Sequence, residues 1–366
     1  MLPRFIEEIY SVKRLHFALG HQSHRRSSKP NSLSGRLRVL MNPMVQPRGF
    51  TPLDLLSLDA DLPTDENMNQ RSLRDPVPAV REDEADGEIA SLFADIRTRL
   101  GTSSVNLVWR HLATFPGALP WCWGAIAPLY RCGALASQAR DFRRSLQGPV
   151  LPELPPEVMR VFDLDAEDVD RIRATLRGYY ASCTMNILSL NALRLFMDGS
   201  ASVAPLAAGS LDLTSHPDPP PPIEAMARFP DPADVAPHVV DLAWRLNALG
   251  ERGDGTILAS LYRYLANWPS FLGVSWTLLA PLATDGQLEA AISQCLAQAD
   301  SRSGQLVDRL AAPVLEPDGP TRNAIRIVME DFGRNAIAKV IPITRALLTA
   351  VGSGGGLGLP PVPSQR

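Results

Sequence analysis

The chain has 366 residues, of which 45% are hydrophobic and 20% are charged, and its formal net charge at pH 7 is -3. This composition is typical of a globular protein, and the charge gives no footprint for nucleic acid or an acidic membrane. The chain has 33 arginines but only three lysines, Lys13, Lys29 and Lys339. Because the arginines are spread along the chain, we interpret them as a high-GC bacterial coding bias.

Cysteine and apolar patterns exclude further classes of protein. The four cysteines are too few for a disulfide scaffold, and none has metal-ligand or Cys-x-x-Cys spacing. The longest apolar runs, near 119–130 and 271–283, fall short of the roughly 20 residues of a membrane span and contain proline. No signal peptide is evident at the N-terminus. We expect a cytoplasmic protein with no metal, no cofactor, no nucleic-acid partner and no membrane contact.

Both ends of the chain differ in composition from its middle. Residues 1–50 carry nine Lys/Arg against two acids, and residues 51–77 are acidic and polar. We expect residues 1–77 to be a disordered extension or the product of an over-extended start. Residues 352–366, rich in Gly and Pro, predict a flexible tail, and residues 206–222 predict a proline-rich linker.

An internal repeat organises the residues between these ends. Residues 109–133 and 262–286 are identical at ten of 25 positions at a constant offset of 153. Among the matched pairs are Arg110/Arg263, Trp123/Trp276 and Pro128/Pro281. Residues 165–196 match 319–350 more weakly at an offset of 154. The order and spacing predict two copies of one unit, in residues 78–205 and 223–351.

The repeated unit reads as helical. In each copy Thr114 or Asn267 precedes an aromatic-Pro pair, and we expect it to cap the next helix. Asp165, and Asp318 with Pro320, predict the starts of a later helix. Trp123 and Trp276 lie on apolar faces and are expected to be equivalent buried core residues. No stretch shows strand alternation, so we predict an all-α fold of two pseudo-symmetric repeats packed into one body.

The segments LATFPGALP, LANWP and DLDAEDVDRIRATL resemble the group I 2-haloacid dehalogenases from about Pro78 to Gly352. The resemblance implies an all-α fold with the active site between two halves, commonly as a homodimer. It also implies cofactor-free hydrolysis, in which a buried Asp activates the water that displaces halide from C2 while an Asn assists. A carboxylate in a dry pocket suits that proton transfer.

The chemical residues of the family are not matched in this chain. Counting from the Trp-Pro pair, the family's catalytic Asp corresponds to Leu261, whereas Ser260 matches the pocket serine. The assisting Asn corresponds to Cys183, and the first-half pocket aromatics correspond to Ser104 and Leu107. Leucine accepts no proton, so the implied mechanism cannot run through position 261.

Other residues could carry the chemistry instead. Asp254 lies two helical turns before Leu261, but its Gly-Asp-Gly context is typical of a turn. Cys183, Thr184 and Asn186 form a polar set that more often has a buried structural role. His111 fits a packed helix histidine, and Glu330 and Asp331 fit a solvated face, although they could approach the cleft.

Two hypotheses follow from the sequence. The first is a dehalogenase-type hydrolase with a relocated base or another substrate. The second is a non-catalytic member of the family that binds a small carboxylate or serves in assembly. The substrate-binding residues are expected among Ser104, Leu107, Cys183, Asn186, Ser260 and Leu261.

Overall fold

Helices make up the whole secondary structure of the described chain. The computed structural model describes residues 72–199, 226–311 and 316–352, and within these ranges it contains no strand. The predicted all-α fold is confirmed. The described residues all fall in one compact unit of the chain. The predicted linker at 206–222 lies outside the described residues, as does nearly all of the tail predicted at 352–366.

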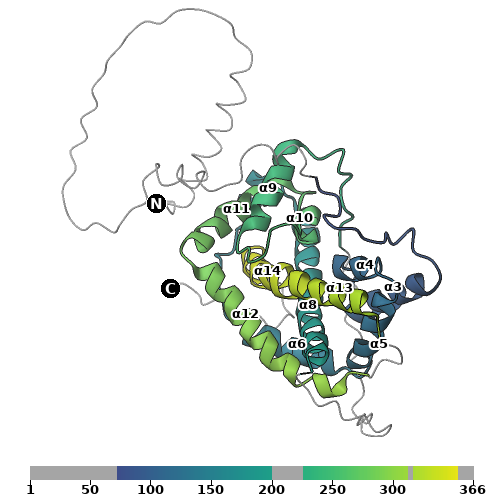
Figure 1. Ribbon diagram of the computed structural model, residues 1–366. Coiled ribbons are helices and arrows are strands. Elements are labelled where there is room, and N and C mark those ends of the chain that lie inside the picture. Colours follow the sequence, from purple (N-terminus) through teal and green to yellow (C-terminus); the bar gives the residue numbers. More distant parts are fainter. Residues whose placement is uncertain (1–71, 200–225, 312–315, 353–366) are drawn as a thin grey trace, which may run out of the picture. The chain divides into compact units, whose positions relative to one another are not determined.

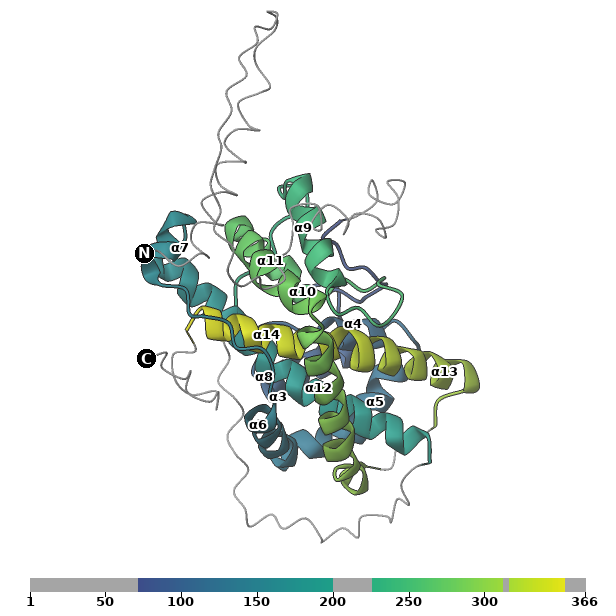
Figure 2. The same ribbon diagram turned by 90° about the vertical axis from the view of Figure 1, so that its left-hand side faces the viewer.

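Two buried helices lie at the centre of the fold. Helix α8 (Ala166–Met197) is 32 residues long, and every residue from 182 to 193 is buried. It packs most extensively on α14 (Ala338–Ala350), all of whose residues are buried. Figures 1 and 2 show the chain of α14 crossing α8 in the middle of the molecule. The buried part of α8 and the whole of α14 thus form the core, with several buried polar side chains among the apolar ones.

The other helices cover this pair in two sets. The first set precedes α8 in the chain: α3 (Gly87–Leu100), α4 (Leu107–Leu112), α5 (Ala118–Arg131), α6 (Ala134–Ser145) and α7 (Pro156–Val161). The second set precedes α14: α9 (Pro237–Ala248), α10 (Ser260–Leu265), α11 (Pro269–Thr284), α12 (Gln287–Gly304), the short 3-10 helix η3 (Val307–Arg309) and α13 (Gly319–Val328). Helices α6 and α12 both pack on α8.

Local sequence signals explain some helix ends and not others. Asp165 and Asp318 cap α8 and α13, accepting hydrogen bonds of 2.8 Å from the backbone N–H groups of Asp168 and Thr321, as predicted. The prediction for Thr114 and Asn267 is wrong. Their side chains donate back to the carbonyl groups of His111 and Tyr264, so they close the preceding short helices instead.

The helix bounds follow the spacing of the predicted repeat. Helices α4 and α10 both have six residues and are separated by 153 positions, and α6 and α12 begin at that same separation. Gly133 and Gly286, which precede α6 and α12, both have a positive φ that favours glycine. Superposition of the two halves remains a prediction, which these matched bounds support.

A π-helical segment, η4 (Met329–Ile337), joins α13 to α14. Its Gly333 faces α8, where an added Cβ would lie 3.8 Å from the Leu190 Cβ. A π turn closes one residue later than an α turn and so takes up an extra residue. The helix caps Asp165 and Asp318 are 153 positions apart, whereas the matched pair Ile187/Ile341 is 154 apart, so the extra residue falls between Asp318 and Ile341, where this segment lies.

The prediction that the two repeat tryptophans are equivalent buried core residues is wrong, because only Trp123 is buried. Trp123 is 1% exposed, packs edge-on against Trp109 and donates from Nε1 to Asp95 at 2.9 Å. Trp276 is only partly buried. The difference arises because α3, α4, α6, α8 and α13 all pack on α5, whereas α11 is covered mainly by α9, α10 and α12.

A buried ion cluster joins the two halves. Asp75 accepts hydrogen bonds from Arg110 Nη1 and Nη2 at 2.8 and 2.9 Å and also pairs with Arg263 Nη1. Burial raises the pKa of Asp75, but Arg110 and Arg263 outweigh that effect and lower it below the usual value. The two arginines are equivalent residues of the predicted repeat.

The folded body therefore begins earlier than the sequence indicates. The extension predicted to end at residue 77 contains Leu73, which is 2% exposed, and Asp75 of the ion cluster. Trp244 Nε1 donates to the Ser72 carbonyl at 3.3 Å, and Val80 N–H donates to the Arg110 carbonyl at 3.0 Å. We call residues 72–80 the N-terminal strap. A short polar sequence gives no sign of such packing.

We expect Trp123→Ala to lower the free energy of unfolding by about 3–5 kcal/mol, because it leaves a large cavity in the core. Trp276→Ala should cost roughly 1–2 kcal/mol, since less of that side chain leaves water on folding. Urea unfolding of both variants would measure the difference. Equal losses would contradict the asymmetry between α5 and α11.

We expect Asp75→Asn to lower the free energy of unfolding at neutral pH by about 3 kcal/mol, because two buried arginines lose their counterion. The Asp75 pKa is lowered in the fold, so its contribution is present above about pH 4 and is lost as the pH falls through the folded value. Urea unfolding from pH 7 down to pH 3 should therefore show the difference between variant and native protein shrinking.

Asp83→Asn is the matched control, because the Asp83–Arg81 pair is exposed. Such a surface pair adds little, so this variant should unfold as the native protein does. A loss from Asp83→Asn as large as that from Asp75→Asn would contradict the importance of the cluster.

Candidate functional site

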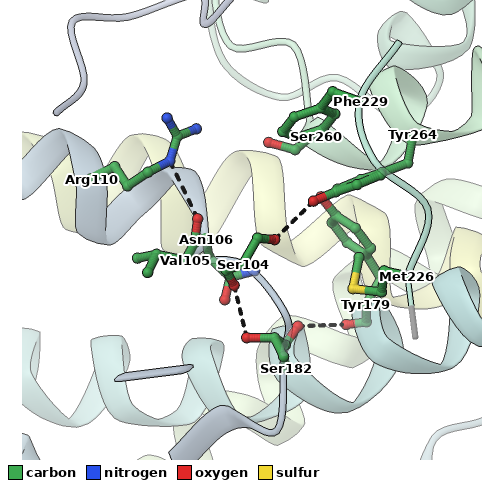
Figure 3. A pocket seen from close by; sticks show the side chains of 11 residues that line it. Ser104, Val105, Asn106, Arg110, Tyr179, Ser182, Met226, Phe229, Ser260 and Tyr264 are labelled. Atoms are coloured by element: carbon green, nitrogen blue, oxygen red, sulfur yellow. Dashed lines mark hydrogen bonds between the residues drawn. The ribbon is translucent and has the colours of Figure 1, made fainter. Parts of the chain in front are cut away.

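A small cavity lies where residues of both halves meet. Its first-half lining comes from the loop before α4, from α4 itself and from α8, and its second-half lining from residues 226–229 and α10. Figure 3 shows these side chains. The lining residues are Thr102, Ser104, Val105, Asn106, Arg110, Tyr179, Ser182, Met226, Phe229, Ser260 and Tyr264.

Hydroxyl groups dominate the polar part of the lining. The Ser104 and Tyr264 hydroxyls form a hydrogen bond of 2.8 Å across the two halves. Thr102 Oγ1 donates to the Ser104 carbonyl at 2.8 Å and fixes that loop. Arg110 Nε donates to the Val105 carbonyl at 3.3 Å, which places a guanidinium at the cavity wall. The lining thus has one cation and no carboxylate.

The two tyrosines stay neutral across the physiological range. Burial raises the pKa of Tyr179 well above its usual value, although a hydrogen bond with Ser260 opposes the shift. Burial also raises the pKa of Tyr264. Neutral phenols can donate to an anionic ligand but cannot take a proton from water as phenolates do.

Side chains fill most of the cavity in this conformation. Its free space is about 10 Å³, close to the lower limit for one water molecule. Phe229 stacks on Tyr264 with ring centroids 4.0 Å apart, and the Arg263 Cζ lies 4.1 Å from the Phe229 centroid. A ligand of several heavy atoms therefore requires these side chains to move.

A larger groove of about 730 Å³ lies on the other side of Met226 and Phe229. Asp168 and Trp268 belong to its wall, and Trp268 Nε1 donates to Asp168 at 2.8 Å. Because Met226 and Phe229 line both the groove and the cavity, their side chains lie between the two.

The structure places some predicted binding residues at the cavity and others behind it. Ser104 and Ser260 line the cavity. Leu107 and Leu261 are buried on α4 and α10 but are not among the lining residues. Leu261, which the family resemblance aligns with the base, is fully buried and has no group that could accept a proton.

Cys183 and Asn186 lie on α8, one and four residues beyond the lining residue Ser182. Burial raises the pKa of the Cys183 thiol to about 12, so it stays protonated. Asn186 Oδ1 accepts from Trp109 Nε1 at 3.3 Å and from the Tyr130 hydroxyl at 3.4 Å, while its buried Nδ2 has no partner. Neither residue lines the cavity.

The acidic candidates lie elsewhere. Asp254 is exposed and accepts hydrogen bonds from the Thr256 amide and hydroxyl at 3.0 and 2.8 Å, which lower its pKa. This is the turn geometry that its sequence predicts, and it makes Asp254 a weak base. Burial, with the charges of Asp254 and Glu330, raises the pKa of Asp331, and His111 opposes that shift. None of these four residues lines the cavity.

Two other carboxylates contact residues that line the cavity without lining it themselves. Asp75 reaches it through Arg110, and Glu82 Oε1 accepts from the Val105 N–H at 2.7 Å. Within the described ranges, no group of three or more His, Cys, Asp or Glu side chains could hold a metal ion. No helix in those ranges is long and apolar enough to cross a membrane.

Arg110, Tyr179 and Tyr264 were missed as site residues by the sequence reasoning. Arg110 and Arg263 were visible as repeat identities, but such an identity indicates a shared scaffold as readily as a site. A charged residue kept in both copies of an otherwise apolar helix was the available signal.

The chain is similar in sequence and in fold to known proteins of one kind. No protein-family model matches it. A curated relative, "2-haloacid dehalogenase, configuration-inverting" from Alcaligenes xylosoxydans xylosoxydans, is 29% identical over 224 residues, covering 58% of this chain and 72% of the relative.

Solved structures agree at the level of the fold. One of a D-2-haloacid dehalogenase mutant with D-2-CPA has a TM-score of 0.56 and 15% identity, covering 76% of this chain and 97% of the other. Another, of D-2-haloacid dehalogenase with L-LA, has a TM-score of 0.55 and 16% identity, covering 74% and 95%. The chain is thus similar in sequence to a 2-haloacid dehalogenase and shares the all-α fold of the D-2-haloacid dehalogenases.

Proposed function

We propose that the protein is a dehalogenase-type hydrolase that acts on a small 2-substituted carboxylate in the cavity between its halves. The observation that carries the proposal is the position of that cavity, which is lined by Ser104 and Ser260, the residues that the family resemblance assigns to the pocket. The reaction would break the C2–halide bond, with the halide leaving as an anion. The hydroxide of a water molecule would bond to C2, and the water's second proton would pass to a base.

The lining suits the carboxylate end of such a substrate. Arg110 supplies positive charge at the wall, and the Ser104, Tyr179 and Tyr264 hydroxyls supply neutral donors. Excluding water strengthens both kinds of interaction, because the local dielectric constant falls. The Phe229 and Met226 side chains would surround the apolar carbon. The expected homodimer and the expected cytoplasmic location remain part of this proposal.

Hydrolysis requires a base that accepts a proton from water. No carboxylate lines the cavity, and Leu261 occupies the family position. Among the described acids, Glu82 lies close to the lining through its Oε1, and its Oε2 pairs with Arg97, so Glu82 has one arginine partner where Asp75 has two. If the cavity opens to admit substrate, Glu82 is the better placed acid to take the proton.

A second candidate function is a non-catalytic protein that binds a small carboxylate. One observation favours it, namely that the lining combines a cation and six hydroxyl side chains with no base. Water activation contributes on the order of 10²–10⁴-fold to such hydrolysis, so its loss would leave binding without turnover.

Halide release from D- and L-2-chloropropionate by the purified native protein separates the two functions. We expect release above the uncatalysed rate from at least one enantiomer, falling about 10²-fold or more in Glu82→Gln if Glu82 is the base. Asp254→Asn should leave the rate unchanged, since Asp254 is exposed in a turn away from the cavity.

Three other results would contradict hydrolysis with Glu82 as the base. Loss of activity in Asp254→Asn alone would show that the base was misplaced. No release by the native protein, with release appearing in Leu261→Asp, would favour the non-catalytic function. Binding of 2-chloropropionate with no turnover in any of these proteins would exclude hydrolysis of this substrate.

A further inference from the structure

A carboxylate of the protein itself holds two buried arginines, Arg110 in the cavity wall and Arg263 behind the lining residue Phe229. Arg110 and Arg263 are both 7% exposed, and Asp75 lies between them. Arg110 binds both oxygens of Asp75, in the paired geometry with which a guanidinium also binds a ligand carboxylate. Asp75 therefore has the same chemistry as one end of a small carboxylic acid.

Arg263 is not saturated by this contact. It reaches Asp75 through Nη1, whereas its Nε is buried without any hydrogen-bond partner. A buried donor of a charged group without an acceptor is costly, and a second acceptor would remove that cost. The guanidinium carbon lies 4.1 Å from the centre of the Phe229 ring, and Phe229 lines the cavity. The free donor is therefore next to the site.

Asp75 itself belongs to a segment held at separate points. The strap 72–80 contains no helix and is fixed by Leu73, by the Asp75 cluster and by single hydrogen bonds at Ser72, Pro78 and Val80. The Asp75 side chain is 22% exposed, so water reaches it while both arginines are buried. Loss of the Asp75 contact would free two guanidinium groups without unfolding any helix.

We propose that Arg110 and Arg263 form the carboxylate-binding site of this protein, and that Asp75 occupies it as an internal competitor in the closed form. A small monocarboxylate displaces Asp75, pairs with Arg110 and takes the free Nε of Arg263. The cavity, with about 10 Å³ of free space in this conformation, opens in the same step. The ligand class rests on the proposed function, but the exchange of carboxylates does not require hydrolysis.

Competition of this kind weakens the apparent affinity for ligand by the fraction of molecules in which the site is free. Asp75→Ala removes the competitor, so it should bind propionate, an unreactive carboxylate, about tenfold or more tightly than the native protein does. Isothermal titration calorimetry measures both dissociation constants. Propionamide, which has the same shape without charge, should bind neither protein at the same concentrations.

Asp95→Ala is the matched control. Asp95 is also partly buried, with a side chain 28% exposed, and it also pairs with two arginines, Arg99 and Arg131. It does not line the cavity. Its variant should bind propionate as the native protein does, and Arg263→Gln placed in the Asp75→Ala background should abolish the gain.

Hydrogen exchange in the native protein tests the displacement without any substitution. At saturating propionate, the Val80 amide, which donates to the Arg110 carbonyl, should exchange faster as the strap loosens. If Asp75→Ala does not fold, this measurement still tests whether propionate displaces Asp75. Asp75→Asn is then the second variant for the comparison of propionate affinities.

Three results would overturn the proposal. The first is an affinity of Asp75→Ala or Asp75→Asn for propionate no higher than that of native protein and Asp95→Ala. The second is unchanged or slower strap exchange at saturating propionate. The third is no propionate binding by any of these proteins. Tight propionate binding by Asp75→Ala without halide release would support the binding site and refute the hydrolytic function, so the two failures are distinguishable.

Discussion

Burial of α8 is the constraint on which the rest of the structure depends. A 32-residue helix with an unbroken buried stretch at 182–193 needs cover on every side, and α6, α12, α14 and the π segment supply it. Its polar side chains must then find partners inside the protein. Thr184 accepts from Arg143 at 2.8 Å, and Asn191 donates to Asp300 at 3.1 Å. The cavity arises where Tyr179 and Ser182 of this same helix face residues of the other half.

The sequence predicted the parts of the fold that depend on local chemistry. Asp165 and Asp318 are caps because a carboxylate on the residue directly before a helix accepts a free backbone amide of the first turn. Trp276 was misjudged because periodicity reports which face of a helix is apolar but not how many neighbours cover it. The strap was missed for a similar reason, since Leu73 and Asp75 are held by residues far away in the sequence.

The site was predicted in position more than in chemistry. Ser104 and Ser260 line the cavity, because the scaffold motifs that locate them also locate α4 and α10. Arg110 could not be recognised as a site residue, since its role depends on Asp75 and on the way two helices from different halves meet. The residue that the family resemblance aligns with the catalytic base is the buried Leu261, whereas the nearby cavity is lined by hydroxyl groups and Arg110.

The π segment at Met329–Ile337 has a consequence for the symmetry of the molecule. A π turn holds one residue more than an α turn, so the helix beyond it keeps the face that it would present without the extra residue. The residues of α14 can therefore face the core as their matched residues in α8 do, although they lie one position further along the chain. Removing one residue from this segment would convert the π turn to an ordinary α turn and should leave the buried face of α14 in place. Removing one residue from α14 itself would turn all residues beyond the deletion by about 100° about the helix axis, because an α-helix has 3.6 residues per turn.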